Sequence, residues 1–316
     1  MANKEERLMR FIITGGTGLI GQALTSDLLK EGHEVIVLSR NPAMGKDVLP
    51  QGTRFVGWDA KTSESWVEWA EGAAAIINLA GERLAGPNPF KLRWTDRRKD
   101  LICESRLHAG QAVSQAVEAV KEKPKVVVQA SGINYYPIGD DIATEETPPG
   151  EGFLPHICLN CWEISTQPVE DLGVRRVVMR TGPVLHPKSG PLPPMVLQSK
   201  LFLGGPLGEG QQWFSWIHPT DVVGGIRFLI DHPQATGAFN LCAPNPLTNA
   251  TFSQVLGRVL RRPSILPLPS FVLKLIFGEM ASTMLTGVRA VPTRLQAMGY
   301  TFRFPEAGEA LKDLLL

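Results

Sequence analysis

Four glycines lie close together near the start of the chain, between two runs of apolar residues. The run 11–13, Phe-Ile-Ile, reads as a short buried parallel strand, and 34–40 reads as a second one. The glycines that follow the first run are Gly15, Gly16, Gly18 and Gly21. Apolar residues then recur at every fourth position, as on one face of a helix: Ile20, Leu24 and Leu28. This βαβ unit constrains the fold more than any other feature.

Glycine is costly unless the backbone needs its freedom. Here the glycines allow a sharp turn, a close approach to a pyrophosphate, and tight packing of helix on strand. Free N–H groups at the helix start would then face the phosphates. We therefore predict dinucleotide binding rather than a merely structural turn, by a cradle of Gly15, Thr17, Gly18, Leu19, Ile20 and Gly21.

The residue that ends the second strand is expected to meet the adenosine ribose, about 20 positions after the turn. NAD favours a carboxylate there, but this strand ends in Ser39 and Arg40. A hydroxyl and a guanidinium suit a 2′-phosphate, so NADP is the predicted cofactor. The alternative is that Arg40 is only a solvated charge at a strand end.

Strands and helices continue to alternate along the chain. Further strands are expected at 53–59, 73–81, 125–132 and 174–184. The pattern predicts an α/β fold with a doubly wound parallel sheet, a Rossmann domain over 9–185. Ligands of such sheets lie at the carboxyl ends of the strands, where Gly81, Ser131 and Thr181 stand.

The second half is richer in proline and glycine from Leu185 onward. Helices are expected at 195–202, 248–260 and 271–277, and 237–244 is expected to return to the first domain as a strand. We therefore expect a smaller α+β substrate lobe over 186–316.

Composition excludes several classes of protein. Lysine and arginine number 32 against 31 aspartates and glutamates, so no net charge favours nucleic acid or anionic membranes. The first ten residues lack the apolar core of a signal peptide, and no run of about 18 apolar residues could span a membrane. Four cysteines in 316 residues indicate a reduced, cytoplasmic protein without a disulfide scaffold.

The sequence resembles the extended short-chain dehydrogenase/reductase superfamily in TGGTGLIG, NLAG, ASGINYYP and WIHPTDV. More narrowly it is similar to the bacterial and organellar epimerase family with a characteristic C-terminal domain. This narrower similarity rests on the segments NLAGERLAG, RWTDRRKDLICESRL, LGGPLGEGQQWFSWIH, PLTNATF, FGEMA, VPTRLQAMGYTFRFP and EALKDLL. The resemblance runs from Met9 onward. It implies further cofactor contacts at Leu79, Ala80, Gly81, Glu82 and Pro183.

The superfamily's proton transfer uses a tyrosine and a lysine four residues later. Their slots fall near Pro155 and Leu159, in the expected helix 153–163, and both groups are missing. The narrower family usually lacks them too. Ser131 and Tyr136 are therefore the candidate catalytic residues. The alternative is that Tyr135 and Tyr136 merely line a pocket.

Arg106 stands where the superfamily usually has an asparagine under the nicotinamide. It is expected to reach the cofactor's phosphates or a substrate carboxylate, the alternative being a helix-surface ion pair with Glu104.

The chain contains one Cys-x-x-Cys motif, formed by Cys158 and Cys161, with His156 close by. A single motif of this kind is poor evidence for a metal site, so no metal is predicted. The two cysteines are expected to be packing residues. His218 is expected to be structural, with Thr220 or Asp221 capping the helix that follows.

Two functions fit these features. The first is an NADP-dependent oxidoreductase or epimerase on a small polar or sugar-like substrate. The alternative is a non-catalytic NADP(H)-binding protein that regulates a partner or senses redox state. A small-molecule substrate and a possible homodimer are the expected partners.

Overall fold

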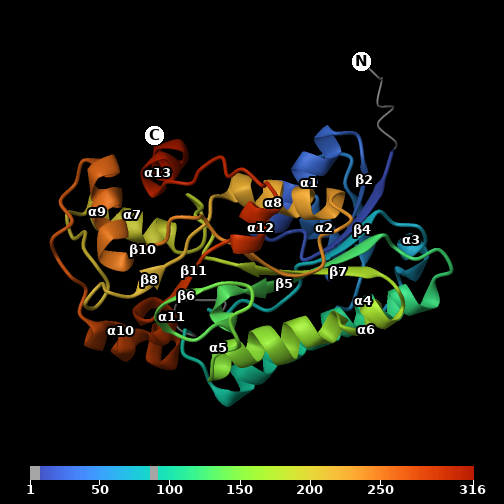
Figure 1. Ribbon diagram of the computed structural model, residues 1–316, viewed down its shortest axis with the longest axis horizontal. Coiled ribbons are helices and arrows are strands. Elements are labelled where there is room, and N and C mark those ends of the chain that lie inside the picture. The colour runs from blue at the N-terminus through green and yellow to red at the C-terminus, as the bar shows by residue number, and fades with distance from the viewer. Residues whose placement is uncertain (1–7, 86–91) are drawn as a thin grey trace.

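A parallel sheet of seven strands forms the centre of the computed structural model, which describes residues 8–85 and 92–316. Their order in the sheet is β3-β2-β1-β4-β5-β7-β9 (Figure 1). The strands are β1 (Arg10–Thr14), β2 (Glu34–Ser39), β3 (Arg54–Gly57), β4 (Ala75–Asn78), β5 (Val126–Gly132), β7 (Arg175–Thr181) and β9 (Gly237–Leu241). The chain starts in the middle, builds one half outward, and returns to build the other. This confirms the doubly wound α/β fold.

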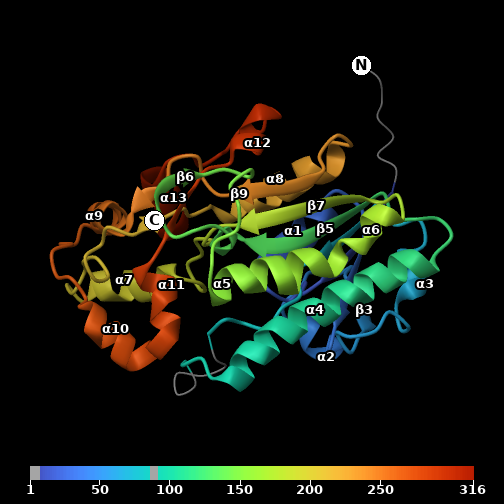
Figure 2. The same cartoon turned by 60° about the horizontal axis from the view of Figure 1, so that its bottom comes forward.

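Helices cover both faces of the sheet (Figure 2). Phe11 and Ile13 of β1 pack toward α1 (Leu19–Lys30) and α8 (Pro219–Asp231). Ile12, between them, packs toward α4 (Asp96–Ala119) on the other face. Successive side chains of a strand point to opposite faces, and both faces are covered here, which is why the central residues of β1 are all apolar.

Short helices complete both layers. After β2 and β3 come α2 (Pro42–Gly45) and α3 (Val67–Ala70). Beside α4 runs one continuous helical stretch: α5 (Phe153–His156), the π-helix η2 (Ile157–Glu163), the 3₁₀ turn η3 (Ile164–Thr166) and α6 (Pro168–Asp171). The expected helix 153–163 is therefore present, but its second part is wound as a π-helix. Such segments are frequent at functional sites.

The C-terminal lobe lies beyond the carboxyl ends of the strands (Figure 1). Its helical elements are α7 (Leu192–Lys200), α9 (Asn249–Leu260), α10 (Ser270–Phe277), η4 (Gly278–Ala281), α11 (Ser282–Leu285) and α13 (Ala307–Leu315). Strand β8 (Trp213–Phe214) pairs with β10 (Leu247–Thr248). As expected, β9 returns to the sheet beside β7, together with α8 and the short α12 (Thr293–Ala297).

Two local features differ from the expectations. The 3₁₀ turn η1 (Ile133–Tyr135) leads from β5 into β6 (Gly139–Ala143), which pairs with the distant β11 (Val288–Ala290). The cap of α8 is His218, whose Nδ1 accepts a hydrogen bond from the Thr220 N–H at 3.2 Å. Thr220 and Asp221 are thus not the cap, because both already lie inside the helix.

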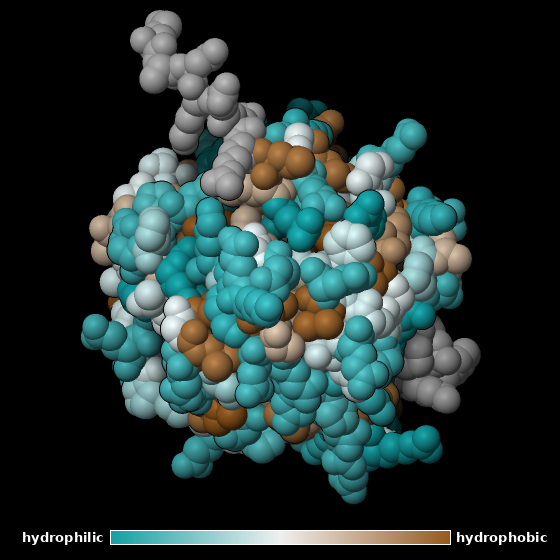
Figure 3. Space-filling view, turned by 90° about the vertical axis from the view of Figure 1, so that its right-hand side faces the viewer, coloured by the Kyte–Doolittle hydropathy of each residue, from teal (hydrophilic) through white to brown (hydrophobic). Residues whose placement is uncertain are grey.

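The described helices include none that is both long and apolar enough to cross a membrane. On the side of the molecule that carries α3, hydrophilic residues predominate and apolar ones are scattered among them (Figure 3).

Candidate functional site

The glycine turn has the geometry of a phosphate cradle. Gly15 has a φ of +65°, and a Cβ on it would lie 2.7 Å from the Leu79 carbonyl oxygen. A Cβ on Gly21 would lie 2.5 Å from the Gly16 Cα, so helix α1 packs directly on the turn. In contrast Gly18, which caps α1, is exposed and has an ordinary φ of −77°. The first N–H groups of α1 have no carbonyl partner in their own helix and remain free for an anion.

Thr14, at the end of β1, fixes the loop after β4 against this turn. Its Oγ1 accepts hydrogen bonds from the N–H groups of Leu79 and Ala80, both at 3.1 Å, and donates to Asn78 Oδ1 at 2.6 Å. The Ala80 carbonyl accepts a bond from Trp162 Nε1 at 3.1 Å. Of the predicted cofactor positions 79–82, Leu79 and Ala80 are therefore tied to the residue that precedes the glycine turn.

Ser39 and Arg40 lie at the end of the neighbouring strand. Thr14 pairs with Leu38 in the β1–β2 register, which puts the strand end 39–40 beside the start of the glycine turn. The Ser39 Oγ accepts a bond from the Asn41 N–H, and the Arg40 side chain is exposed. A guanidinium at this place is free to meet a ligand at the cradle.

Arg106 is buried, so the alternative of a surface ion pair with Glu104 is wrong. Its Nη1 donates to the carbonyls of Glu82 (3.0 Å) and Ile102 (2.7 Å), and its guanidinium lies 4.1 Å from the ring of Trp162. Burial lowers the pKa of Arg106 to about 10, which leaves it charged at neutral pH. Arg106 therefore supports the 79–82 loop from beneath. Its predicted contact with a cofactor or substrate stays a prediction.

Ser131 belongs to a buried polar network that the sequence analysis did not foresee. Its Oγ donates to Glu163 Oε1 at 2.7 Å. Arg180, from β7, grips the same carboxylate with Nε and Nη2, each at 2.9 Å. All three are less than a tenth exposed. The available signal was Arg180 directly after the apolar run 177–179 of the strand RRVVMRT, because a charge buried in such a strand needs a partner.

Tyr136 closes this network on the other side of Arg180. Its hydroxyl donates to Asn240 Oδ1 at 2.7 Å and accepts from Arg180 Nη1 at 3.1 Å. The residue is 1% exposed, and burial raises its pKa to about 12. Both candidate catalytic hydroxyls are thus engaged inside the protein. Their catalytic role stays a prediction, with Glu163, Arg180 and Asn240 as the groups that hold them.

The raised pKa of Tyr136 predicts a loss of stability in alkali. The phenol ionises near pH 10 when unfolded and near 12 when folded. Its contribution to the free energy of unfolding is therefore complete below pH 10 and is lost as the pH rises to 12, by about 2 kcal/mol. Urea unfolding from pH 9 to 12 measures this. Tyr136→Phe should make the decline less steep, leaving the parts due to Tyr300 and to the buried thiols Cys158 and Cys242, whose pKa values burial raises as well. An equally steep decline in the variant would contradict this assignment.

The cysteines behave differently from the expectation of simple packing residues. Cys161, on η2, forms a disulfide with Cys103 of α4, with Cα atoms 5.2 Å apart, whereas Cys158 is a free buried thiol. The expectation was wrong for Cys161 because the two helices bring residues 58 positions apart face to face. His156 lies within 4.8 Å of both bonded sulfurs. Sulfurs that are bonded to each other are not thiolate ligands, so this group is not a metal site in the oxidised form.

A cavity of about 280 Å³ lies between the strand ends and the C-terminal lobe. Ile133 and Asn134, which follow β5, and Pro183, which follows β7, form its sheet side. Trp213, Phe214 and helix α10 form the lobe side. Pro183 was a predicted cofactor residue, so the cavity begins where the cofactor cradle is expected to end. Ser131 and Tyr136 are not among its described lining residues.

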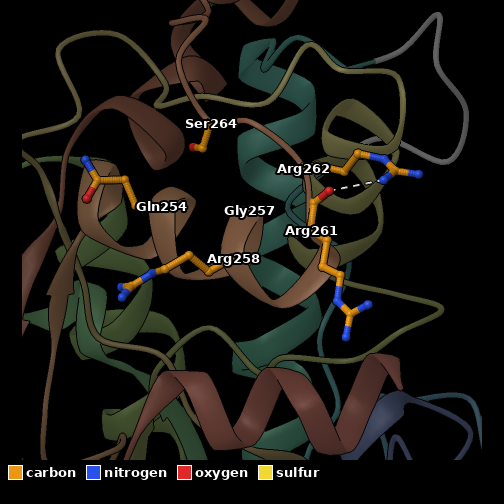
Figure 4. A pocket seen from close by; sticks show the side chains of 6 residues that line it. All are labelled: Gln254, Gly257, Arg258, Arg261, Arg262 and Ser264. Carbon is orange, nitrogen blue, oxygen red and sulfur yellow. Dashed lines mark hydrogen bonds between the residues drawn. The ribbon is translucent and has the colours of Figure 1, made fainter.

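A second hollow, of about 560 Å³, lies at the end of α9 and carries Arg258, Arg261 and Arg262. The three guanidinium groups point away from one another (Figure 4). They do not converge on one ligand, and basic residues at a helix C-terminus favourably meet its dipole. The strand-end cavity is therefore the better candidate site.

Comparison with known proteins gives matches over nearly the whole chain. Residues 11–156 match the NAD dependent epimerase/dehydratase family, and residues 268–314 match a domain of unknown function, DUF1731. Epimerase family protein YfhF of Bacillus subtilis is 35% identical over 97% of this chain and 98% of its own length. Human epimerase family protein SDR39U1 is 35% identical over 97% of this chain and its full length.

Solved structures agree with these matches. The crystal structure of human SDR39U1 with NADPH has a TM-score of 0.84 at 35% identity, and covers 97% of this chain and 99% of that one. The UDP-glucose 4-epimerase of Thermus thermophilus, in complex with NAD, has a TM-score of 0.76 at 18% identity and 97% coverage of both chains, which shows the shared fold alone. With relatives of this identity over 97% of its length, the chain belongs to the epimerase family, whose short-chain dehydrogenase/reductase-like Rossmann fold continues here into a DUF1731 domain.

Proposed function

We propose that this protein binds NADP(H) and acts as an oxidoreductase or epimerase on a small molecule held in the strand-end cavity. One observation carries the proposal. Three features lie at the edge of the sheet that the carboxyl ends of the strands form: the glycine cradle, the strand end 39–40 and the cavity mouth at Pro183. This is where ligands of doubly wound sheets bind.

The cradle fits the cofactor. Side chains on Gly15 or Gly21 would collide with backbone, so the turn is built to bring the main chain close to a ligand. Leu19 and Ile20 would hold the pyrophosphate with N–H groups, next to Gly18, whose own N–H donates to the Gly15 carbonyl at 2.9 Å. Ser39 and Arg40 would hold the 2′-phosphate. The NADPH of the human relative's crystal structure supports this choice. Bound NADPH supplies a hydride from its nicotinamide ring.

The chain's own residues then have defined tasks. The loop 79–82, held by Thr14, Trp162 and Arg106, would form the floor beneath the cofactor. The raised pKa of Tyr136 keeps its hydroxyl protonated at neutral pH, so it cannot act as a base there. A proton would have to come from a water or from a Ser131 and Tyr136 pair exposed by rearrangement. We therefore expect slow turnover, with reduction favoured over oxidation.

Arg40→Ala tests the cofactor choice. A charge-assisted contact to phosphate is worth about 1.5–3 kcal/mol, so NADPH should bind roughly tenfold to a hundredfold more weakly, with little change for NADH. Calorimetric titration of both nucleotides measures this. Arg54→Ala is the matched control, since Arg54 is an exposed arginine on the adjacent strand that pairs with Glu34. Equal affinity of the wild type for NADPH and NADH would rule out the assignment of Arg40.

Non-catalytic binding of NADP(H), as a regulator or redox sensor, is the second candidate. Two observations favour it: Pro155 and Leu159 occupy the tyrosine and lysine slots, and both candidate hydroxyls face inward. Single-turnover oxidation of bound NADPH against a panel of aldehydes, ketones and keto-sugars separates the two functions. Oxidation with any compound supports the enzyme, and none with any supports the binding protein. A homodimer and a cytoplasmic location stay predictions.

A further inference from the structure

The lining of the strand-end cavity limits the kind of molecule that can bind there. None of the described residues that line it is charged, and most are apolar. Proline and methionine come from α7, aromatic residues from β8, and Leu273 and Phe277 from α10. A phosphate or carboxylate held here would lose its hydration without gaining a cation, which is costly. The lining therefore selects against charged ligands.

Most polar groups of the lining are already satisfied within the protein. Gln212 donates to the carbonyls of Leu207 and Met284, and Ser215 bonds the backbone at Val288 and Ala290. The side-chain amides of Asn134 and Gln198 have no hydrogen-bond partner among the described residues. They leave room for one or two polar contacts to a ligand, on opposite sides of the cavity.

Helix α10 is apolar on both of its sides. Leu273 is 3% exposed and faces the cavity, whereas Phe271 and Leu275 are 69% and 70% exposed. Apart from Ser270 and Lys274, the exposed side chains of this helix are apolar. An exposed apolar surface beside a cavity is typical of a site that meets an apolar partner or ligand.

From these three observations we infer that the cavity binds an uncharged, largely apolar molecule that carries a single carbonyl or hydroxyl group. The Asn134 amide orients that oxygen at the sheet side, next to Pro183, and the apolar remainder lies against α7, β8 and α10. This inference rests on the proposed function and names its substrate class. It replaces the polar or sugar-like substrate expected from the sequence. At about 280 Å³ the cavity is just below the usual range for ligand sites, about 300–1,000 Å³, and takes a molecule smaller than a nucleotide sugar.

Calorimetry with 2-nonanone as the probe tests this inference, with and without saturating NADPH. The ketone should bind with a Kd of about 1 mM or tighter, and UDP-glucose should neither bind nor displace it. Gln198→Trp fills the cavity from a half-buried position of α7 and should weaken ketone binding at least tenfold. Leu197→Trp is the matched control, because Leu197 is the adjacent residue and is 59% exposed. It should leave the Kd unchanged.

Three results would overturn the inference: no binding of the ketone, binding of UDP-glucose in its place, or full affinity in Gln198→Trp. NADPH affinity is measured in the same titrations. Failure to bind NADPH would overturn the proposed function, while ketone binding blocked by Gln198→Trp would still identify the cavity's ligand class.

Discussion

Glu163→Ala is expected to lower the free energy of unfolding by about 3–5 kcal/mol. The substitution leaves the Arg180 guanidinium, 5% exposed, without the carboxylate that takes two of its hydrogen bonds. It also removes the acceptor of the Ser131 hydroxyl. A charge that stays buried without a partner cannot regain its lost hydration, so the cost far exceeds that of an ordinary hydrogen bond. Urea unfolding followed by circular dichroism measures the change.

Glu170→Ala is the control for this prediction. Glu170 accepts from Arg176 at 2.9 Å, as close a contact as those in the buried pair, but it is 44% exposed. Water replaces the lost partner there, so a cost below about 1 kcal/mol is expected. If both substitutions lowered the free energy of unfolding by the same small amount, burial of the Glu163–Arg180 pair would not contribute to stability, which would contradict this prediction.

Gly18→Val is expected to weaken NADPH binding by a factor of at least about 100. The residue caps α1 with its backbone exposed, so a branched side chain would stand where the pyrophosphate must approach the N–H groups. The fold should persist, because φ is ordinary and a Cβ would lie 3.2 Å from only the Gly15 carbonyl oxygen. Calorimetry gives the affinity, and thermal unfolding shows whether the variant is folded.

Gly308→Val, on α13 of the C-terminal lobe, serves as the matched control. Its Cβ would make an ordinary contact with Val255 at 3.8 Å. NADPH affinity should be that of the wild type. Normal NADPH binding by Gly18→Val would show that the turn is structural and does not hold a phosphate.

The sheet could be predicted from the sequence because each of its strands is indicated by residues that are adjacent in the chain. In the central sheet, each strand up to β7 contains a short apolar run, and the positions expected from the runs differ from the structure by only a few residues at each end. Strand β6 was not predicted, because its sequence, GDDIA, is mostly polar and exposed. Its pairing with β11 joins segments about 150 residues apart.

The candidate site was predictable only where a motif fixes the backbone. The glycine turn and the strand end 39–40 required no knowledge of distant partners. The partners of Ser131 and Tyr136 did require it, since Glu163, Arg180 and Asn240 come from three other elements. The same holds for Cys103 and Cys161, whose spacing matches no local pattern. Residues that meet only through tertiary packing leave no periodic signal.

The Cys103–Cys161 bond has a consequence for how this protein opens. It ties α4, which carries Arg106, to η2, which carries Trp162 and Glu163. The chain between the two cysteines includes β5, which bears Ser131, and Tyr136, which follows the turn η1. In the oxidised form neither helix can leave the sheet without pulling the other along. The floor of the cradle and the buried ion pair therefore open and close as one cooperative unit rather than by independent fraying.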